Sequence, residues 1–316
     1  MKAEGYVRPA SLAEAAAARA EGGIIIAGGT DVMVKGRARG VYAGRTLVDV
    51  SKLEELRQVR ERDGAVEIGA ACTLAELCEH PLIAGKLPLL ADACAHVGGV
   101  QIRNRATIGG NVVNACPASD VIPALMVLGA RVRTTARELP LDALFRACPA
   151  CLRHEGMLVR TCYFPDAAAK KTVLEPDELV VSLIVPVPTE SARWLFHKLT
   201  RTQGIGLARL NIALLNPVKG TGYLTEKLMN PVKGTGYLTE KPINEIAASV
   251  GGLFPKPCVL HVSSPEDARA QLAEKIAAEC AALVDYDYKS RVAPALLADA
   301  VAALLAGETL ERKRRA

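Results

Sequence analysis

The chain has 316 residues and is 50% apolar, so it is long enough for two domains with sizeable cores. Its net charge of +5 is mild, and no basic run is interleaved with aromatic residues, which argues against nucleic-acid binding. There is no apolar run of about 18 residues, so no membrane-spanning helix is expected. The N-terminus does not have the pattern of a secretory signal. Nine scattered cysteines predict reduced thiols and a cytoplasmic location.

The first glycine-rich loop follows an apolar strand. Ser11 has the position of an N-cap for an alanine-rich helix, and Ile24 to Ile26 predict a buried strand. This strand leads into the sequence AGGTD at 27–31. A strand, a glycine-rich turn and a helix N-terminus commonly hold a phosphate, because the helix dipole and its free N–H groups attract anions. The loop has neither GxGxxG nor Walker spacing, so a simple tight turn is the alternative.

Short alternating strands are predicted at 46–50 and 65–70, and a helix at 87–96. Thr73 and Glu76 have the spacing of a capping box, so a helix is expected to begin there. Three cysteines with Ala and Leu neighbours are predicted to be small core residues, not metal ligands: Cys72, Cys78 and Cys94.

The stretch Gln101 to Leu125 holds the second glycine-rich loop. Its paired glycines allow close backbone approach and positive φ, and successive N–H groups in such a turn can hold phosphate oxygens. Asp120 could accept a hydrogen bond from a ribose hydroxyl. A helix is predicted from Pro117 to Leu128, followed by a strand at 130–134. Two such loops indicate one extended ligand that contains a pyrophosphate.

The segment Phe145 to Lys171 has no regular pattern and holds three cysteines: Cys148, Cys151 and Cys162. CxxC is a metal-ligand spacing, but an all-thiolate site needs a fourth sulfur. Free thiols are therefore expected, with an iron–sulfur or zinc site as the alternative. A turn at Pro176-Asp177 and a strand ending at Pro186 follow, and the prolines beyond it predict a domain boundary after residue 188.

The rest of the chain predicts antiparallel strands and helices. A strand at 194–201 carries Lys198 and pairs with a strand at 207–215. A tandem repeat then spans 216–243, where 12 of 14 positions are identical between the two copies. Two copies are too few for a solenoid, so a recent duplication or a sequence error explains the repeat better than a functional module. A strand at 246–250 and helices at 265–283 and 292–305 complete the pattern.

With these elements placed, the sequence resembles the FAD-binding subunit of the molybdenum hydroxylases, a family that includes xanthine dehydrogenase, carbon monoxide dehydrogenase and aldehyde or aromatic hydroxylases. The resemblance rests on the order and spacing of seven motifs: AGGTD (27–31), IGAACT (68–73), QIRNRATIGGN (101–111), ACPASDVIPAL (115–125), LEPDELVVSLIVP (174–186), FHKLTR (196–201) and VGGLFPKP (250–257). It implies a mixed α/β (α+β) fold. An FAD-binding domain of the vanillyl-alcohol-oxidase type spans 1–188, with two α/β subdomains that divide near 55–65. A smaller α+β domain with an antiparallel sheet and helices spans 189–316.

The resemblance also implies where FAD is held. The two glycine-rich loops would hold the pyrophosphate from either side, and Asp120 would lie near the ribitol or ribose. Lys198 would tune the flavin by placing a positive charge near it. The alternative for Lys198 is an ordinary surface charge. The implied cofactor-binding residues are Ile25, Ile26, Ala27, Gly28, Gly29, Thr30, Asp31, Val32, Thr107, Ile108, Gly109, Gly110, Asn111, Val113, Ser119, Asp120, Leu179, Val180 and Lys198.

The function implied is electron relay. Electrons would pass from a molybdenum cofactor through [2Fe–2S] clusters to FAD, and then to an external acceptor such as NAD, a quinone or a ferredoxin. The partners would be an iron–sulfur small subunit and a molybdenum-cofactor large subunit, in a heterotrimer that can itself dimerise. No acid–base constellation is found in the sequence, so no catalytic residue is expected in this chain. The alternatives are a self-sufficient FAD-dependent oxidase or dehydrogenase, and a flavin-binding scaffold without a redox role.

Overall fold

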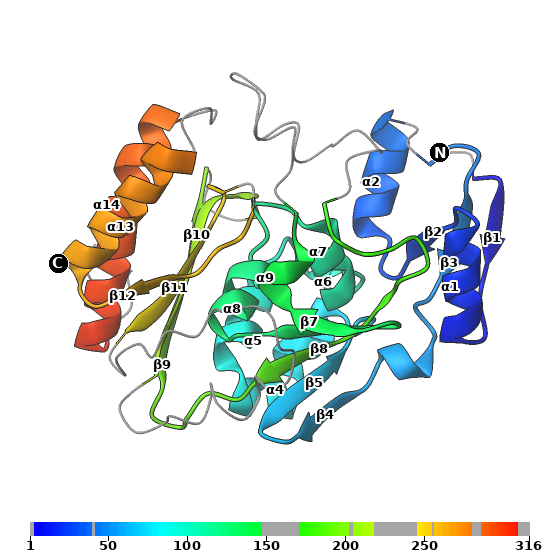
Figure 1. Cartoon of the computed structure of the whole chain (residues 1–316), viewed down its shortest axis with the longest axis horizontal. Helices are drawn as coiled ribbons and strands as arrows, with labels where there is room; N and C mark the ends of the chain where they lie inside the picture. The colour runs from blue at the N-terminus through cyan, green and yellow to red at the C-terminus, as the bar shows by residue number, and fades with distance from the viewer. Residues whose placement is uncertain are drawn as a thin grey trace.

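The computed structural model describes residues 3–39, 42–146, 171–201, 205–217, 245–254, 256–279 and 286–308. Three sheets and their helices form a mixed α+β fold in these ranges, as the sequence predicts (Figure 1). None of the helices described is long and apolar enough to cross a bilayer. Cys148, Cys151 and Cys162, and the tandem repeat beyond its first two residues, lie outside the described residues.

A small parallel sheet forms the N-terminal layer, in the order β1-β3-β2. Its strands are β1 (Gly5–Val7), β2 (Ile24–Ile26) and β3 (Thr46–Asp49), and its helices are α1 (Leu12–Ala20) and α2 (Thr30–Arg39). Ser11 caps α1 as predicted, because its side chain accepts a hydrogen bond from the Glu14 N–H. β2 is half-buried where a buried strand is predicted, since it lies at the edge of the sheet.

A five-stranded antiparallel sheet follows, reached through the 3₁₀ helix η1 (Glu54–Leu56). Its order is β4-β5-β8-β6-β7, with β4 (Val59–Arg62), β5 (Ala65–Gly69), β6 (Arg131–Thr134), β7 (Glu138–Pro140) and β8 (Val180–Pro186). All five β5 residues are buried, so the predicted alternation is wrong there. β8 is the last of these strands in the sequence, yet it occupies the centre of the sheet, between β5 and β6.

Seven short helices pack around this sheet: α3 (Leu74–Glu79), α4 (Pro81–Lys86), α5 (Pro88–Ala95), α6 (Val100–Arg103), α7 (Ile108–Asn114), α8 (Val121–Val127) and α9 (Leu141–Leu144). The predicted capping box of Thr73 and Glu76 is present at the start of α3. Cys72 and Cys94 are buried in the core, as predicted, and Cys78 packs against it. α8 is buried along its whole length and begins at Val121, four residues later than predicted, because residues 117–120 form a loop.

The C-terminal layer is an antiparallel sheet in the order β12-β11-β10-β9, with α13 (Pro265–Glu279) and α14 (Tyr286–Ala306) on one face. The strands are β9 (Arg193–Thr200), β10 (Ala208–Asn216), β11 (Ile246–Gly251) and β12 (Leu260–Val262). β9 and β10 pair as the predicted hairpin. α14 begins six residues earlier than predicted and contains Pro294. The opposite face of β10 and β11 packs against α8.

Both faces of β10 are buried, each in a different core. Leu210, Ile212 and Leu214 pack with α13 and α14, whereas Ala213 and Leu215 pack with α8 and the five-stranded sheet. Because side chains alternate along a strand, Asn211 shares a face with Ala213 and Leu215. This strand therefore brings a polar side chain from the C-terminal layer against the segment that contains the second glycine-rich motif.

Candidate functional site

The first glycine-rich loop ends in backbone N–H groups that have no acceptor among the described residues. Gly29 has φ +74°, a left-handed conformation, and α2 begins at the next residue. Within the described part of the chain, no acceptor is found for the backbone N–H groups of residues 28–32. A ligand anion can take these groups, since they lie at the N-terminus of a ten-residue helix whose dipole favours negative charge.

The second glycine-rich segment is the start of a helix, and the predicted N–H concavity is wrong there. The Gly109 N–H donates to the Ala70 carbonyl at 2.9 Å, and the Gly110 N–H donates to Thr107 Oγ1 at 3.2 Å. Neither glycine has a positive φ. Gly109 is needed for close packing, because a Cβ there would lie 2.7 Å from the Ala70 oxygen. This segment can therefore offer a ligand side chains such as Asn111 more readily than backbone N–H groups.

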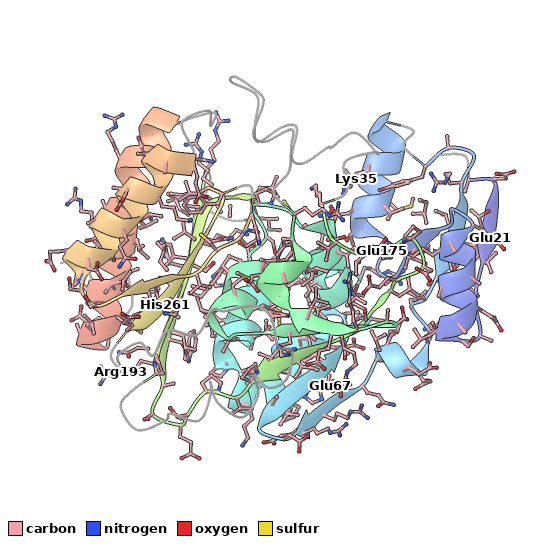
Figure 2. All side chains as sticks on the ribbon, in the orientation of Figure 1. Glu21, Lys35, Glu67, Glu175, Arg193 and His261 are labelled. Atoms are coloured by element: carbon pink, nitrogen blue, oxygen red, sulfur yellow. The ribbon has the colours of Figure 1, made fainter. Side chains whose placement is uncertain are left out.

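The two segments lie against each other, although they are about 80 residues apart in sequence. A Cβ on Gly28 would lie 1.8 Å from the Arg105 carbonyl oxygen, so only glycine permits this approach. Asn114, at the end of α7, donates from Nδ2 to Asp31 Oδ1 at 3.1 Å, and its Oδ1 accepts from Lys35 Nζ. Figure 2 shows Lys35 on α2. Lys35 was not among the residues expected from the sequence, because its pairing with Asn114 exists only in the fold.

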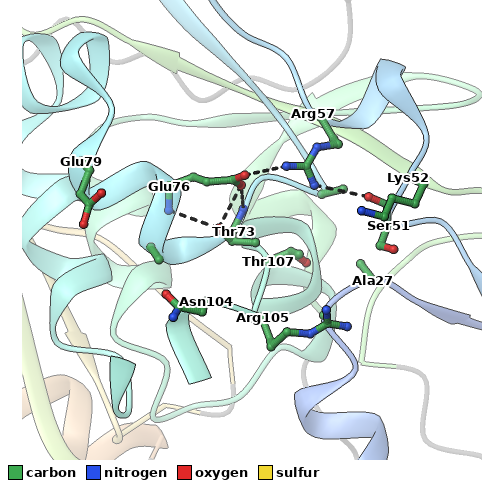
Figure 3. A pocket seen from close by; sticks show the side chains of 13 residues that line it. Ala27, Ser51, Lys52, Arg57, Thr73, Glu76, Glu79, Asn104, Arg105 and Thr107 are labelled. Carbon is green, nitrogen blue, oxygen red and sulfur yellow. Dashed lines mark hydrogen bonds and ion pairs between the residues drawn. The ribbon is translucent and has the colours of Figure 1, made fainter. Parts of the chain in front are cut away.

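A cleft of about 400 Å³ opens beside the contact between these segments (Figure 3). Ala27, Gly28 and Thr107 line one part of it, and polar side chains line the rest, including Ser51, Lys52, Arg57 and Arg105. Arg57 Nη2 lies 2.6 Å from Glu76 Oε1, so its charge is neutralised within the wall. Among the described residues, Lys52 and Arg105 have no carboxylate partner, and Glu79 adds a second carboxylate to the lining. Three cationic and two acidic side chains therefore leave the cleft with a small excess of positive charge.

Asp120 and Lys198 form a buried ion pair. Their side chains are 5% and 8% exposed, and Lys198 Nζ lies 2.6 Å from Asp120 Oδ2 and 2.8 Å from the His96 carbonyl. Asp120 Oδ1 accepts from Asn211 Nδ2 at 2.9 Å. Burial raises the pKa of Asp120, and Lys198 and Asn211 oppose that rise. The alternative of an ordinary surface charge is thus wrong for Lys198. A contact of Lys198 with a flavin stays a prediction, and so does a contact of Asp120 with a ribose or ribitol.

The remaining expected residues flank these features. Leu179 and Val180 are buried at the start of β8, and the next residue's carbonyl accepts from the Ala70 N–H at 2.9 Å. Ala70 in turn accepts from Gly109, so this end of β8 lies beside the start of α7. Ser119 donates to Asn111 Oδ1 at 2.5 Å, which joins it to the same helix. Within the described residues, no group of three or more His, Cys, Asp or Glu side chains is placed to hold a metal.

A strand, a glycine-rich turn and a helix N-terminus with open N–H groups form an arrangement that is typical of nucleotide-cofactor domains. The chain belongs to the family described as FAD binding domain in molybdopterin dehydrogenase, whose model matches residues 1–188.

Among characterised relatives, the chain is 29% identical over 202 residues to the caffeine dehydrogenase subunit beta of Pseudomonas sp. (strain CBB1), a match that covers 63% of each chain. It is 31% identical over 202 residues to the carbon monoxide dehydrogenase medium chain of Hydrogenophaga pseudoflava, which covers 63% of this chain and 64% of that one. These matches span somewhat under two thirds of the relatives' length.

Solved structures share the fold over nearly the whole chain. A carbon monoxide dehydrogenase from Hydrogenophaga pseudoflava, in a form that lacks the Mo-pyranopterin moiety of its cofactor, superimposes with a TM-score of 0.72 at 23% identity, covering 97% of this chain and 98% of that one. Quinoline 2-oxidoreductase from Pseudomonas putida 86 gives a TM-score of 0.71 at 20% identity and 97% and 98% coverage.

Proposed function

We propose that this chain is the FAD-carrying subunit of a molybdenum-dependent dehydrogenase complex, and that it relays electrons from [2Fe–2S] clusters of a partner chain to an external acceptor. The partners proposed are an iron–sulfur small subunit and a molybdenum-cofactor large subunit, which would bind the organic substrate. Family membership and the relatives named as dehydrogenase subunits support this proposal.

The observation that carries the proposal is the row of open N–H groups at residues 28–32. They precede and begin a ten-residue helix, and Gly28 holds this loop directly against the segment that leads to α7. A pyrophosphate needs several donors on one side and a second surface within reach. The described residues fit that requirement, with Asn111 and the exposed edge of Gly110 as the second surface.

In this proposal FAD supplies the redox chemistry when it is bound, and the protein supplies position and electrostatics. Residues 28–32 bind the pyrophosphate through backbone N–H groups, and Asn111 orients it from α7. Leu179 and Val180 provide an apolar contact that excludes water from the flavin ring. Lys198 places a positive charge near the ring while Asp120 limits its effect. Partial or full burial raises the pKa of the Cys72 and Cys258 thiols to about 11, so both remain protonated near neutral pH.

The test is to purify the full chain alone and together with the proteins encoded beside it, and to record absorption spectra, metal content and dye-linked turnover. The expected result is flavin absorbance in the isolated chain without turnover, and turnover once iron–sulfur and molybdenum chains are present. Substrate turnover by the isolated chain would instead indicate a self-sufficient flavoenzyme. Absence of flavin after reconstitution with FAD would contradict the proposal.

Iron analysis of the same isolated chain addresses the three cysteines outside the described residues. Free thiols at Cys148, Cys151 and Cys162 predict no iron. Iron that is lost in Cys148→Ser or Cys151→Ser would contradict that expectation and establish a cluster in this subunit.

A further inference from the structure

The loop at residues 117–120 is held by the C-terminal sheet. It joins α7 to α8 and has no regular structure of its own. The Gly252 N–H donates to the Pro117 carbonyl at 2.7 Å, and Asn211 Nδ2 donates to the Ser119 carbonyl at 2.9 Å. The turn after β11 and the strand β10 therefore fix consecutive parts of a loop that directly follows the second glycine-rich segment.

Asn211 is the centre of this contact. It is fully buried, and its Nδ2 also donates to Asp120 Oδ1 at 2.9 Å. Its Oδ1 finds no hydrogen-bond partner among the described residues and points at Gly251, its neighbour across the β10–β11 pair, where a Cβ would lie 2.0 Å away. The two acceptors fix which way the amide points, because the reversed orientation would place its oxygen against a carbonyl and a carboxylate. What Asn211 provides is thus a pair of donors.

The contact continues from the loop into α7. Ser119 Oγ donates to Asn111 Oδ1 at 2.5 Å and accepts from the Ile122 N–H at 3.3 Å. With its Oδ1 occupied, the Asn111 amide presents Nδ2, a donor, on the remaining side. A side chain on β10 is in this way connected by hydrogen bonds to a residue of the glycine-rich helix, over about 100 residues of sequence.

We propose that Asn211 is a positioning residue for the cofactor: by fixing Ser119 and Asp120, it orients the Asn111 amide toward the FAD pyrophosphate. This inference rests on the proposed FAD site. The C-terminal sheet would then contribute to the affinity for FAD, although Asn211 itself would not contact the cofactor.

The test compares two buried polar residues of the same sheet in the full chain. Asn211→Leu keeps the branching of the side chain at Cγ, with somewhat larger end groups, and removes both donors. Ser249→Ala is the matched control, since Ser249 is 1% exposed on β11 and its hydroxyl donates to the Cys258 carbonyl at 2.8 Å, away from the loop. Thermal unfolding of the apo protein measures the structural cost of each change, and quenching of FAD fluorescence measures affinity.

Asn211→Leu is expected to raise the Kd for FAD about tenfold, the equilibrium equivalent of one lost net hydrogen bond, and to alter the visible circular dichroism of the bound flavin. Ser249→Ala is expected to change Kd by less than about twofold. Because the effect runs through Ser119, Ser119→Ala combined with Asn211→Leu should weaken binding by less than the product of the single changes.

Equal FAD affinity in Asn211→Leu and Ser249→Ala would overturn the inference while leaving the FAD site in place. Failure of the unaltered chain to bind FAD would overturn both. If Asn211→Leu does not fold, Ser119→Ala alone decides: it breaks the same connection from the other side, and normal FAD affinity in that variant refutes the inference.

Discussion

Gly28→Ala tests the contact between the two glycine-rich segments. The added Cβ would lie 1.8 Å from the Arg105 oxygen and 2.6 Å from the Arg105 carbonyl carbon. Ordinary contact between such atoms is about 3.5 Å, so the loop and residue 105 must separate by roughly 1.7 Å. Both obstacles are backbone atoms, which cannot turn aside as a flexible side chain can.

A displacement of that size exceeds the tolerance of hydrogen bonds near 2.9 Å. If two charge-assisted bonds from residues 28–32 to the pyrophosphate are lost, at about 1.5–3 kcal/mol each, binding weakens by at least about 3 kcal/mol. This corresponds to a rise in the Kd for FAD of at least roughly 100-fold. Overpacking should also lower the free energy of unfolding by about 1–3 kcal/mol.

The assay is FAD titration with fluorescence detection, paired with urea unfolding of the apo protein. Gly85→Ala is the control, because Gly85 lies in α4 and a Cβ there would meet nothing within 4 Å. It should leave the FAD affinity unchanged and raise stability by up to about 1 kcal/mol. A folded Gly28→Ala variant whose Kd stays within about threefold of the unaltered chain would refute the reasoning.

Three further predictions follow from buried charges and a helix cap. Lys198→Met leaves Asp120 buried without its cation and should lower the free energy of unfolding in urea by about 3–5 kcal/mol. Adding Asp120→Asn should recover part of that free energy. No recovery would contradict the pairing. The pKa of Glu67 is lowered, because hydrogen bonds and charges from Ser182, Arg60 and Arg133 outweigh the effect of burial. Its contribution to stability is therefore present above the unfolded-state pKa and is lost as the pH falls through the folded-state pKa; Glu67→Gln should flatten this acid limb, and an unchanged pH profile would refute the assignment. Thr73→Ala removes one half of the capping box and should lower the free energy of unfolding by about 1 kcal/mol, a loss that equilibrium denaturation would detect.

Much of the site was accessible from local sequence patterns. The AGGTD loop ends a strand and begins a helix, as its composition predicts, because glycine permits the positive φ of Gly29 and Thr30 can start a helix. The capping box at Thr73, the buried thiols and the β9–β10 hairpin follow from the same kind of pattern. The order of seven motifs indicated the family whose model matches residues 1–188.

The role of Gly109 and Gly110 could not be read from their own segment. A glycine pair suits both a left-handed turn and a tightly packed helix start, and the carbonyls of Ala70 and Cys72 decide for the helix by accepting its first N–H groups. Those residues lie about 40 positions earlier in the sequence. The hydrogen bond between Lys35 and Asn114 could not be predicted either, because the residues around a helical lysine do not indicate its distant partner.

The sequence by itself determined most of the longer elements, their order and the AGGTD loop between a strand and a helix, since these depend on neighbouring residues and on side-chain periodicity. Only the tertiary structure decided which partners the buried charged and amide side chains have. Lys198 is buried against Asp120, and Asn211 reaches Ser119, because β10 packs on α8 and β9 packs on α5. Partners about 80 to 90 residues apart are chosen by sheet topology and packing, and no spacing within either segment encodes them.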